Sequence, residues 1–146
     1  MKLLRDSMAM ESNLAPSKAY LLDTCTLLWL CLEPEKVSER VQQVVTSADS
    51  SSLFVSVVSE WEILLKAGLG KLKLTSPTSE FLIEAKAALT LVSLPLEAAH
   101  CYRFGLLGIV NRDPFDKMLA AQSIENELPI LTPDLVIARY GAKTVW

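Results

Sequence analysis

The sequence has few of the residues on which several classes of protein depend. It contains three cysteines, Cys25, Cys31 and Cys101, and a single histidine, His100. Because the number of cysteines is odd and the chain shows no secretory leader pattern, we expect no disulfide framework and a reducing, cytoplasmic location. One histidine without a close pair of cysteines also excludes the ligand spacing of a zinc site. We interpret His100 as a packed structural residue.

Long apolar runs and an excess of positive charge are also missing. Hydrophobic residues make up 51% of the chain, but no stretch approaches the roughly 18 consecutive apolar residues of a membrane span. We therefore expect no membrane partner. The 14 basic and 17 acidic residues give a net charge of -3, which argues against binding nucleic acid through bulk positive charge alone. An enzyme whose carboxylates hold cations that then meet phosphate remains compatible with this charge.

The length of 146 residues suits one domain. Residues 1–19 are interrupted by charges and Pro16 and lack the apolar core of a signal peptide. We expect them to be an N-terminal extension that is disordered or loosely attached, and we place the domain at residues 20–146.

Short apolar runs alternate with helical patterns along this domain. The apolar runs are continuous, and most are joined through helices, which is typical of a parallel sheet covered on both faces. We therefore predict a three-layer α/β domain with about five parallel strands and a ligand site at their carboxyl edge. The expected strands are 20–22, 53–57, 90–93, 130–131 and 144–145, and the expected helices are 26–32, 38–45, 59–67, 79–88, 96–107, 115–127 and 135–139.

Asp23 and Glu62 are acidic residues with an ordinary structural explanation. Asp23 follows the first expected strand, and aspartate is among the best residues for capping the N-terminus of a helix. Glu62 comes three residues after Ser59, a spacing that predicts a reciprocal capping box.

Asp116 and Asp134 have similar local explanations. Asp113-Pro114 suits a helix cap followed by proline at the first helical position, which places Asp116 in the first turn, where a negative charge favours the helix dipole. Asp134 follows Thr132-Pro133, which has the same cap-then-proline pattern.

The four acids gain significance in combination. Each placement puts the acid just after a strand, at or near the beginning of a helix, and in a parallel sheet such positions share one edge. Clustered carboxylates repel one another, and their pKa values rise unless a cation compensates. Hard oxygen ligands favour Mg²⁺ or Mn²⁺, ions that assist phosphodiester hydrolysis. The pattern predicts a metal-dependent phosphate enzyme without naming its substrate.

Four blocks of this sequence, in series, resemble the PIN domain, and specifically the VapC-type toxins of bacterial toxin–antitoxin pairs. Each block alone is a weak signal, and their order and spacing make the resemblance specific over residues 20–146. The blocks are 22–24 with 28–29, 55–63 running on to 66 and 70–72, 112–122, and 131–134 with 140–141 and 145–146.

The resemblance implies a Rossmann-like parallel sheet, an Mg²⁺ or Mn²⁺ ion and endoribonuclease activity on RNA. It also implies a small antitoxin partner and a homodimer. The family's catalytic and metal-binding acids fall on Asp23, Glu62, Asp116 and Asp134, and its hydroxyl position beside the metal falls on Thr132.

Two departures concern residues close to these acids. Many relatives carry histidine where this chain has Cys25, which we expect to alter nearby contacts and leave metal binding intact. Glu60 lies two residues before Glu62, so the two cannot point the same way on a helix. We assign the ligand role to Glu62, which follows Trp61 and precedes Ile63 as the family pattern requires.

Several residues have supporting roles in this hypothesis. Lys66 follows Glu62 by four residues, so it either forms an ordinary helix pair or orients the ligand and contacts phosphate. Lys71, Lys73 and Arg112 are candidate RNA-backbone contacts, or simply solvated surface. We interpret Asp113 first as a helix cap and second as an outer-sphere residue.

Two alternatives remain open. A phosphatase of the haloacid-dehalogenase type also places an aspartate after the first strand, but it requires a second aspartate where this chain has Cys25. The other alternative is a PIN-fold module that binds RNA or protein without cutting, which the four filled acidic positions argue against.

Overall fold

Five parallel strands form the centre of the domain, in the order β3-β2-β1-β4-β5. The computed structural model describes residues 18–48 and 52–146, so most of the predicted N-terminal extension lies outside the described residues. β1 is central because it pairs with both β2 and β4, and β3 and β5 are the edges of the sheet. The strands are β1 (Tyr20–Leu22), β2 (Leu53–Ser56), β3 (Val92–Leu94), β4 (Ile130–Leu131) and β5 (Thr144–Val145).

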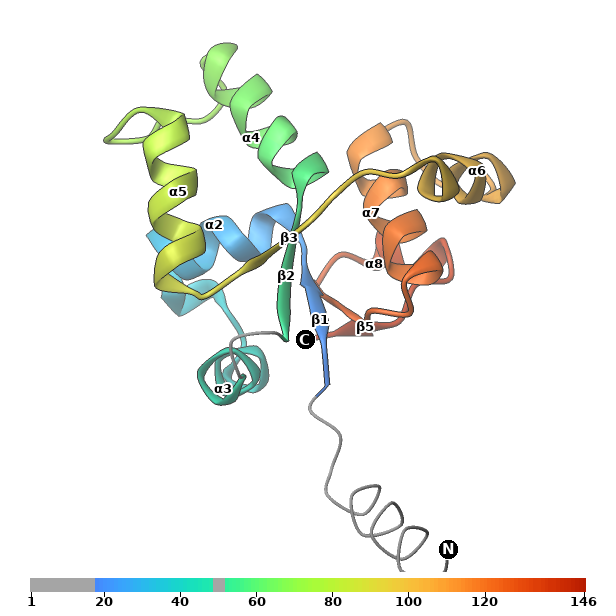
Figure 1. The fold of residues 1–146 in the computed structure, drawn as a ribbon, viewed down its shortest axis with the longest axis horizontal. Helices are drawn as coiled ribbons and strands as arrows, with labels where there is room; N and C mark the ends of the chain where they lie inside the picture. Colours follow the sequence, from blue (N-terminus) through green and yellow to red (C-terminus); the bar gives the residue numbers. More distant parts are fainter. Residues whose placement is uncertain (1–17, 49–51) are drawn as a thin grey trace, which may run out of the picture.

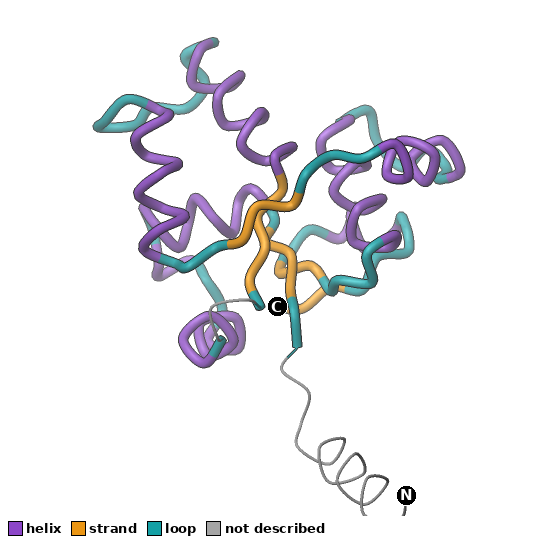
Figure 2. The backbone as a smooth tube through the Cα atoms, viewed as in Figure 1, coloured by secondary structure: helices purple, strands orange, loops and turns teal. Residues whose placement is uncertain are grey.

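Helices cover both faces of this sheet, as Figures 1 and 2 show. α2 to α5 lie on one side and α6 to α8 on the other, which confirms the predicted three-layer α/β architecture. None of the helices in the described ranges is long and apolar enough to cross a membrane. The helices are α2 (Thr24–Leu32), the 3-10 turn η1 (Pro34–Lys36), α3 (Glu39–Ser47), α4 (Val57–Gly68), α5 (Thr78–Ala88), α6 (Ala98–Leu106), α7 (Pro114–Glu125) and α8 (Leu135–Arg139).

The continuous apolar runs are explained by burial on both sides of the sheet. Leu21 and Leu22 of β1 are both fully buried, but Leu21 packs into the cluster that contains α7 and α8, and Leu22 into the cluster that contains α2 and α3. Ile130 and Leu131 of β4 divide between the same two clusters. Burying a leucine side chain contributes about 2 kcal/mol, so alternation with polar residues would sacrifice half of this stabilisation.

Two of the predicted helix caps are confirmed. Asp23 caps α2, with Oδ1 accepting the backbone N–H of Thr24 at 2.7 Å. Asp113 caps α7 with Pro114 at the first helical position, and its Oδ1 accepts the N–H groups of Phe115 at 2.8 Å and Asp116 at 3.3 Å.

The predicted capping box between Ser59 and Glu62 is wrong. β2 ends at Ser56, and α4 begins at Val57, so Ser59 lies inside the helix rather than at its cap. The cap is Ser56, whose Oγ accepts the N–H of Val58 at 3.0 Å. The same Ser56 hydroxyl donates to the side chain of Gln122 on α7, a partner that local spacing does not reveal.

The predicted cap at Thr132 is also wrong. α8 begins at Leu135, and its cap is Asp134, whose Oδ1 accepts the N–H of Val136 at 2.9 Å. Thr132 Oγ1 instead accepts the N–H of Asp134 at 3.0 Å, so it shapes the turn between β4 and α8.

His100 has the structural role that we predicted. It is 1% exposed on α6, and its Nδ1 accepts the backbone N–H of Glu97 at 3.0 Å. Its Nε2 lies 2.6 Å from Oδ1 of Asn126, beyond the end of α7. The ring therefore ties α6 to α7.

Candidate active site

A cleft of about 310 Å³ brings together the four predicted acids. The beginnings of α2, α7 and α8 and the middle of α4 supply its acidic side chains. Asp113 joins them, so five carboxylates line one cavity. The lining residues are Asp23, Thr24, Cys25, Leu28, Glu62, Ile63, Lys66, Lys71, Leu72, Asp113, Asp116 and Asp134.

Asp23 is the most enclosed of the aspartates that line the cleft. It is 4% exposed, and its Oδ2 accepts hydrogen bonds from Thr132 Oγ1 at 2.6 Å and Cys25 Sγ at 3.3 Å. Burial raises the pKa of Asp23, and the negative charge of Glu62 adds to this effect, although the hydrogen bonds from Thr132, Cys25 and Thr24 oppose it. The carboxylate is therefore rigidly held in surroundings that disfavour its charge.

Asp116 shows the effect of clustered negative charge clearly. Burial and, to a smaller extent, the charges of Asp113, Asp23 and Asp134 together raise its pKa to about 7, against a lowering hydrogen bond from Asn111. Contrary to our expectation, Asp116 does not follow a strand, because α7 comes after α6 and a loop. The packing of α7 beside α4, rather than a strand end, brings this acid into the cleft.

Glu62 is the glutamate of α4 that faces the cleft. It is 4% exposed, and its Oε2 is paired with Nζ of Lys66, one turn along the helix. Burial lowers the pKa of Lys66, but the hydrogen bond and charge of Glu62 outweigh this, so the pKa is raised. Glu60 turns away and pairs with Lys86 of α5 at 2.8 Å. This geometry supports the choice of Glu62.

Asp113 and Asp134 each combine two roles. Each caps a helix through Oδ1, and each also lines the cleft. A carboxylate has two oxygens with several acceptor sites, so capping does not exclude a second contact.

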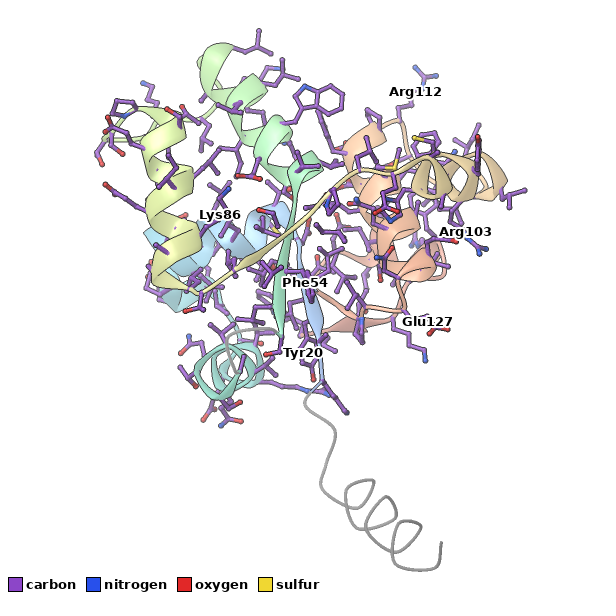
Figure 3. The ribbon with its side chains drawn as sticks, viewed as in Figure 1. Tyr20, Phe54, Lys86, Arg103, Arg112 and Glu127 are labelled. Atoms are coloured by element: carbon purple, nitrogen blue, oxygen red, sulfur yellow. The ribbon has the colours of Figure 1, made fainter. Side chains whose placement is uncertain are left out.

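The predicted supporting residues divide into two groups. Lys66 and Lys71 line the cleft, and Thr132 reaches it through its hydrogen bond to Asp23. Lys73 and Arg112 are exposed and are not part of the lining, and Figure 3 shows Arg112 projecting away from the body of the domain.

Sequence reasoning missed two contacts that organise the site. Thr24 Oγ1 donates to Ser59 Oγ at 2.9 Å, which ties the beginning of α2 to α4. Asn111 Nδ2 donates to Asp116 Oδ2 at 3.4 Å. The position of Thr24 directly after Asp23 was a usable signal, but nothing in the local sequence marks Asn111.

The donor set has the chemistry that a hard divalent cation prefers. Five carboxylates and the Thr24 hydroxyl line the cleft, and a cation would offset the burial and the neighbouring negative charges that raise the pKa values of Asp23 and Asp116. Within residues 18–48 and 52–146, no three His, Cys, Asp or Glu side chains are already placed to hold one ion. The acids are arranged around their own partners, such as Lys66 at Glu62 and the helix N–H group at Asp134.

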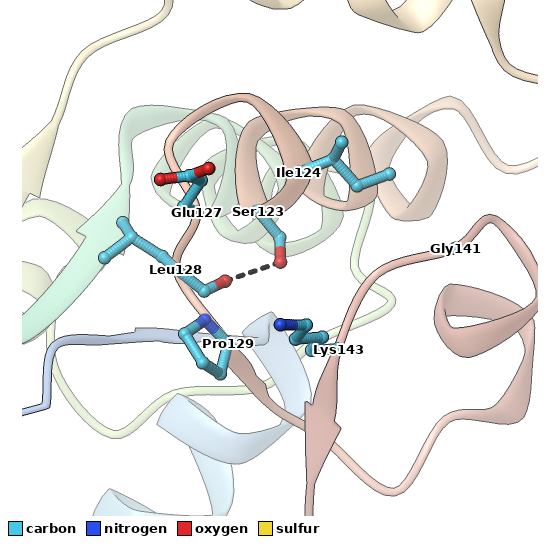
Figure 4. Close-up of a pocket in the computed structure, with 7 residues that line it drawn as sticks. All are labelled: Ser123, Ile124, Glu127, Leu128, Pro129, Gly141 and Lys143. Atoms are coloured by element: carbon cyan, nitrogen blue, oxygen red, sulfur yellow. Dashed lines mark hydrogen bonds between the residues drawn. The ribbon is translucent and has the colours of Figure 1, made fainter.

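A larger hollow of about 440 Å³ lies at the end of α7, away from these acids. Figure 4 shows Glu127 and Lys143 as its only charged lining residues, with the Ser123 hydroxyl donating to the carbonyl oxygen of Leu128. This hollow has neither clustered acids nor an acid–base pair suited to hydrolysis, so the acidic cleft is the candidate site.

Solved structures of similar fold come from bacterial two-protein complexes. DNA-bound VapBC from Salmonella typhimurium matches with a TM-score of 0.67 at 16% identity, covering 88% of this chain and 97% of the other. VapBC2 from Rickettsia felis, bound to a promoter DNA fragment, matches with a TM-score of 0.65 at 14% identity, covering 88% of this chain and 97% of the other. FitAcB from Neisseria gonorrhoeae matches with a TM-score of 0.63 at 19% identity, covering 87% of this chain and 96% of the other.

The family of this chain is established by a comparison of its sequence with known families. Among curated proteins, no sequence gives a significant match to this chain. The sequence model of the PIN domain, however, matches residues 20–143, which include the four predicted acids of the cleft and strands β1 to β4, and the match ends directly before β5. This chain belongs to the PIN domain family.

Proposed function

We propose that this chain is an endoribonuclease that depends on Mg²⁺ or Mn²⁺ and acts as the toxin of a toxin–antitoxin pair. The observation that carries the proposal is the convergence of Asp23, Glu62, Asp116 and Asp134 in one cleft of a PIN domain. The similar fold of VapBC and FitAcB supports the toxin assignment.

Asp23, Glu62, Asp116 and Asp134 are the residues that would hold the ion. When bound, a divalent ion supplies the positive charge that activates water and stabilises the oxygens of a phosphodiester during hydrolysis. Thr132 and Thr24 hold the Asp23 carboxylate in one orientation through hydrogen bonds to its two oxygens.

Lys66 and Lys71 provide positive charge at the same cleft. Lys66 holds the buried Glu62 carboxylate in place, and its side chain is 44% exposed, which leaves it accessible to a phosphate of the RNA backbone. Lys73 and Arg112 are assigned a weaker role, because both are exposed outside the cleft lining.

A small antitoxin protein is the proposed partner, and a second copy of this chain is proposed as well. VapBC and FitAcB are complexes, which supports the antitoxin. Large apolar side chains are exposed on α4 and around the end of α6, and such surfaces mark protein–protein contacts. They are Trp61, Leu64 and Leu65 on α4, and Tyr102, Leu106 and Ile109 on or after α6.

The experiment that tests this function is cleavage of RNA by the purified chain in the presence of Mg²⁺, Mn²⁺ or EDTA. We expect cleavage only with the metals, loss of cleavage in Asp116→Asn, and normal cleavage in Glu84→Gln, which changes an exposed acid on α5. Expression of the wild-type chain alone should arrest growth, and Asp116→Asn should relieve the arrest.

The outcomes separate the competing hypotheses. RNA that binds tightly but stays intact with either metal would favour a non-catalytic PIN module and overturn the nuclease. A phosphorylated Asp23 trapped during turnover would favour the phosphatase instead.

A further inference from the structure

The loop at residues 107–113 connects α6 to the candidate active site through Asn111. Its Nδ2 donates to Asp116 Oδ2 at 3.4 Å. On the other side, the Tyr140 hydroxyl donates to Asn111 Oδ1 at 3.2 Å. The amide of Asn111 therefore bridges a tyrosine of the core and a carboxylate of the cleft.

The two contacts determine the orientation of the amide together. A carboxylate that holds a cation is ionised and only accepts hydrogen bonds, so the NH₂ group of Asn111 must face Asp116 in that state. The amide oxygen then faces Tyr140, whose hydroxyl has a proton to donate. Reversing the amide would place its oxygen next to the Asp116 carboxylate oxygen, where the two acceptors would repel each other.

Tyr140 is well placed to act as a fixed support. It is 6% exposed directly after α8 and belongs to the same core cluster as Leu119 and Ile137. Its hydroxyl also accepts the backbone N–H groups of Val110 and Asn111, each at 3.3 Å. One buried hydroxyl thus holds both the backbone of the loop and the Asn111 side chain.

We propose that Tyr140 and Asn111 are positioning residues: Tyr140 anchors the loop and the Asn111 amide, and Asn111 orients the Asp116 carboxylate for the divalent ion. This inference rests on the proposed function and adds two residues to its site. Neither residue lines the cleft, so in this proposal both act through Asp116.

The first test measures Mn²⁺ affinity by electron paramagnetic resonance in Tyr140→Phe, Asn111→Ala and the double variant. Residues that support a metal ligand typically change affinity by 10- to 100-fold, and we expect about tenfold weaker binding in Asn111→Ala. The double variant should lose about as much Mn²⁺ affinity as Asn111→Ala alone, because Tyr140 acts through Asn111. Glu84→Gln, at an exposed acid of α5, is the control and should bind Mn²⁺ normally.

The second test uses the metal-free protein, so its result does not depend on the proposed function. In Tyr140→Phe, amide hydrogen exchange at Val110 and Asn111 should be about fivefold faster, the factor that corresponds to one ordinary hydrogen bond. Exchange in the core strands should not change, since the aromatic ring remains in place.

The outcomes distinguish the two proposals. The positioning inference is overturned, and the proposed function stands, if the wild-type chain binds Mn²⁺ but Asn111→Ala binds it equally well. It is also overturned if the loss of Mn²⁺ affinity in the double variant equals the product of the losses in the two single variants. Unchanged exchange in Tyr140→Phe overturns the anchoring role of Tyr140. A wild-type chain that neither binds Mn²⁺ nor cuts RNA overturns the proposed function, and the positioning role falls with it.

Discussion

At the scale of single residues, one side chain can both cap a helix and line the acidic cleft. Asp23 caps α2 and Asp134 caps α8, and both line the cleft. A helix N-terminus stabilises a nearby negative charge, so it is a suitable place to hold an acid that must remain ionised. The local stabilisation offsets part of the repulsion between the clustered carboxylates.

Asp116 carries a pH dependence that the metal-free protein should reveal. Its pKa of about 7 in the folded state lies above its ordinary value of 3.8, so the folded chain binds more protons between these values. Stability from this group is therefore present at low pH and is lost as pH rises towards about 7. Asp116→Asn should raise the free energy of unfolding at pH 8 by about 1–2 kcal/mol, after a discount for solvent screening.

Urea unfolding in EDTA at pH 4 and pH 8 measures this effect. The increase in the free energy of unfolding caused by Asp116→Asn should be present at pH 8 and nearly absent at pH 4, where Asp116 is protonated in the wild type. Glu84→Gln should show no such gain, since Glu84 is exposed. An equal gain at both pH values would contradict the electrostatic explanation.

At the scale of elements, the beginning of α7 places Asp116 in the cleft. Asp113 Oδ1 accepts two backbone N–H groups there, those of Phe115 and Asp116, and Pro114 occupies the first helical position. This arrangement fixes the first turn of α7, so damage to the cap should also disturb the site.

Substitutions at Asp113 separate capping from charge. Asp113→Ala should lower the free energy of unfolding by about 1 kcal/mol, because alanine cannot cap the helix. Asp113→Asn should be nearly as stable as the wild-type chain, because asparagine can cap it. If RNA cleavage follows stability, Asp113 acts as a cap. A large loss of cleavage in a fully stable Asp113→Asn would instead assign it an outer-sphere role.

Element prediction succeeded where the signal was local. The caps at Asp23 and Asp113 were predictable because each precedes a helical pattern directly, and the second also precedes proline. The cap at Ser56 was missed because β2 passes into α4 without a loop, and the hydroxyl of Ser56 also bonds to Gln122, 66 residues away. Spacing rules contain no information about such a partner.

At the scale of the whole molecule, the site joins parts of the fold that no single element holds together. Acids from several helices meet because strand ends place α2, α4 and α8 at one edge of the sheet and α7 packs beside α4. A ligand that binds several of them should therefore stabilise the complete fold rather than one helix.

Metal binding should be measurable as a shift in the thermal unfolding midpoint. Mn²⁺ at 100 times its dissociation constant should stabilise the wild-type chain by about 2.7 kcal/mol, and EDTA should reverse the shift. Asp116→Asn should show a much smaller shift, and Glu84→Gln a normal one. Equal shifts in the wild type and Asp116→Asn would indicate binding outside the cleft.

The sequence by itself determined the element types, their order and the three-layer class. Apolar runs, helical periodicity and capping residues are local properties, and each leaves a pattern within a few residues. The series of blocks around the four acids was also sufficient to identify the PIN domain, which the family match confirms.

Only the tertiary structure decided how these acids are held. Thr132 meets Asp23 across 109 residues, and Thr24 meets Ser59 across 35. Tyr140 reaches Asn111 across 29 residues. Such contacts, and the raised pKa of Asp116, depend on which helices pack side by side and on how much water they exclude, and neither property is encoded in the spacing of residues along the chain.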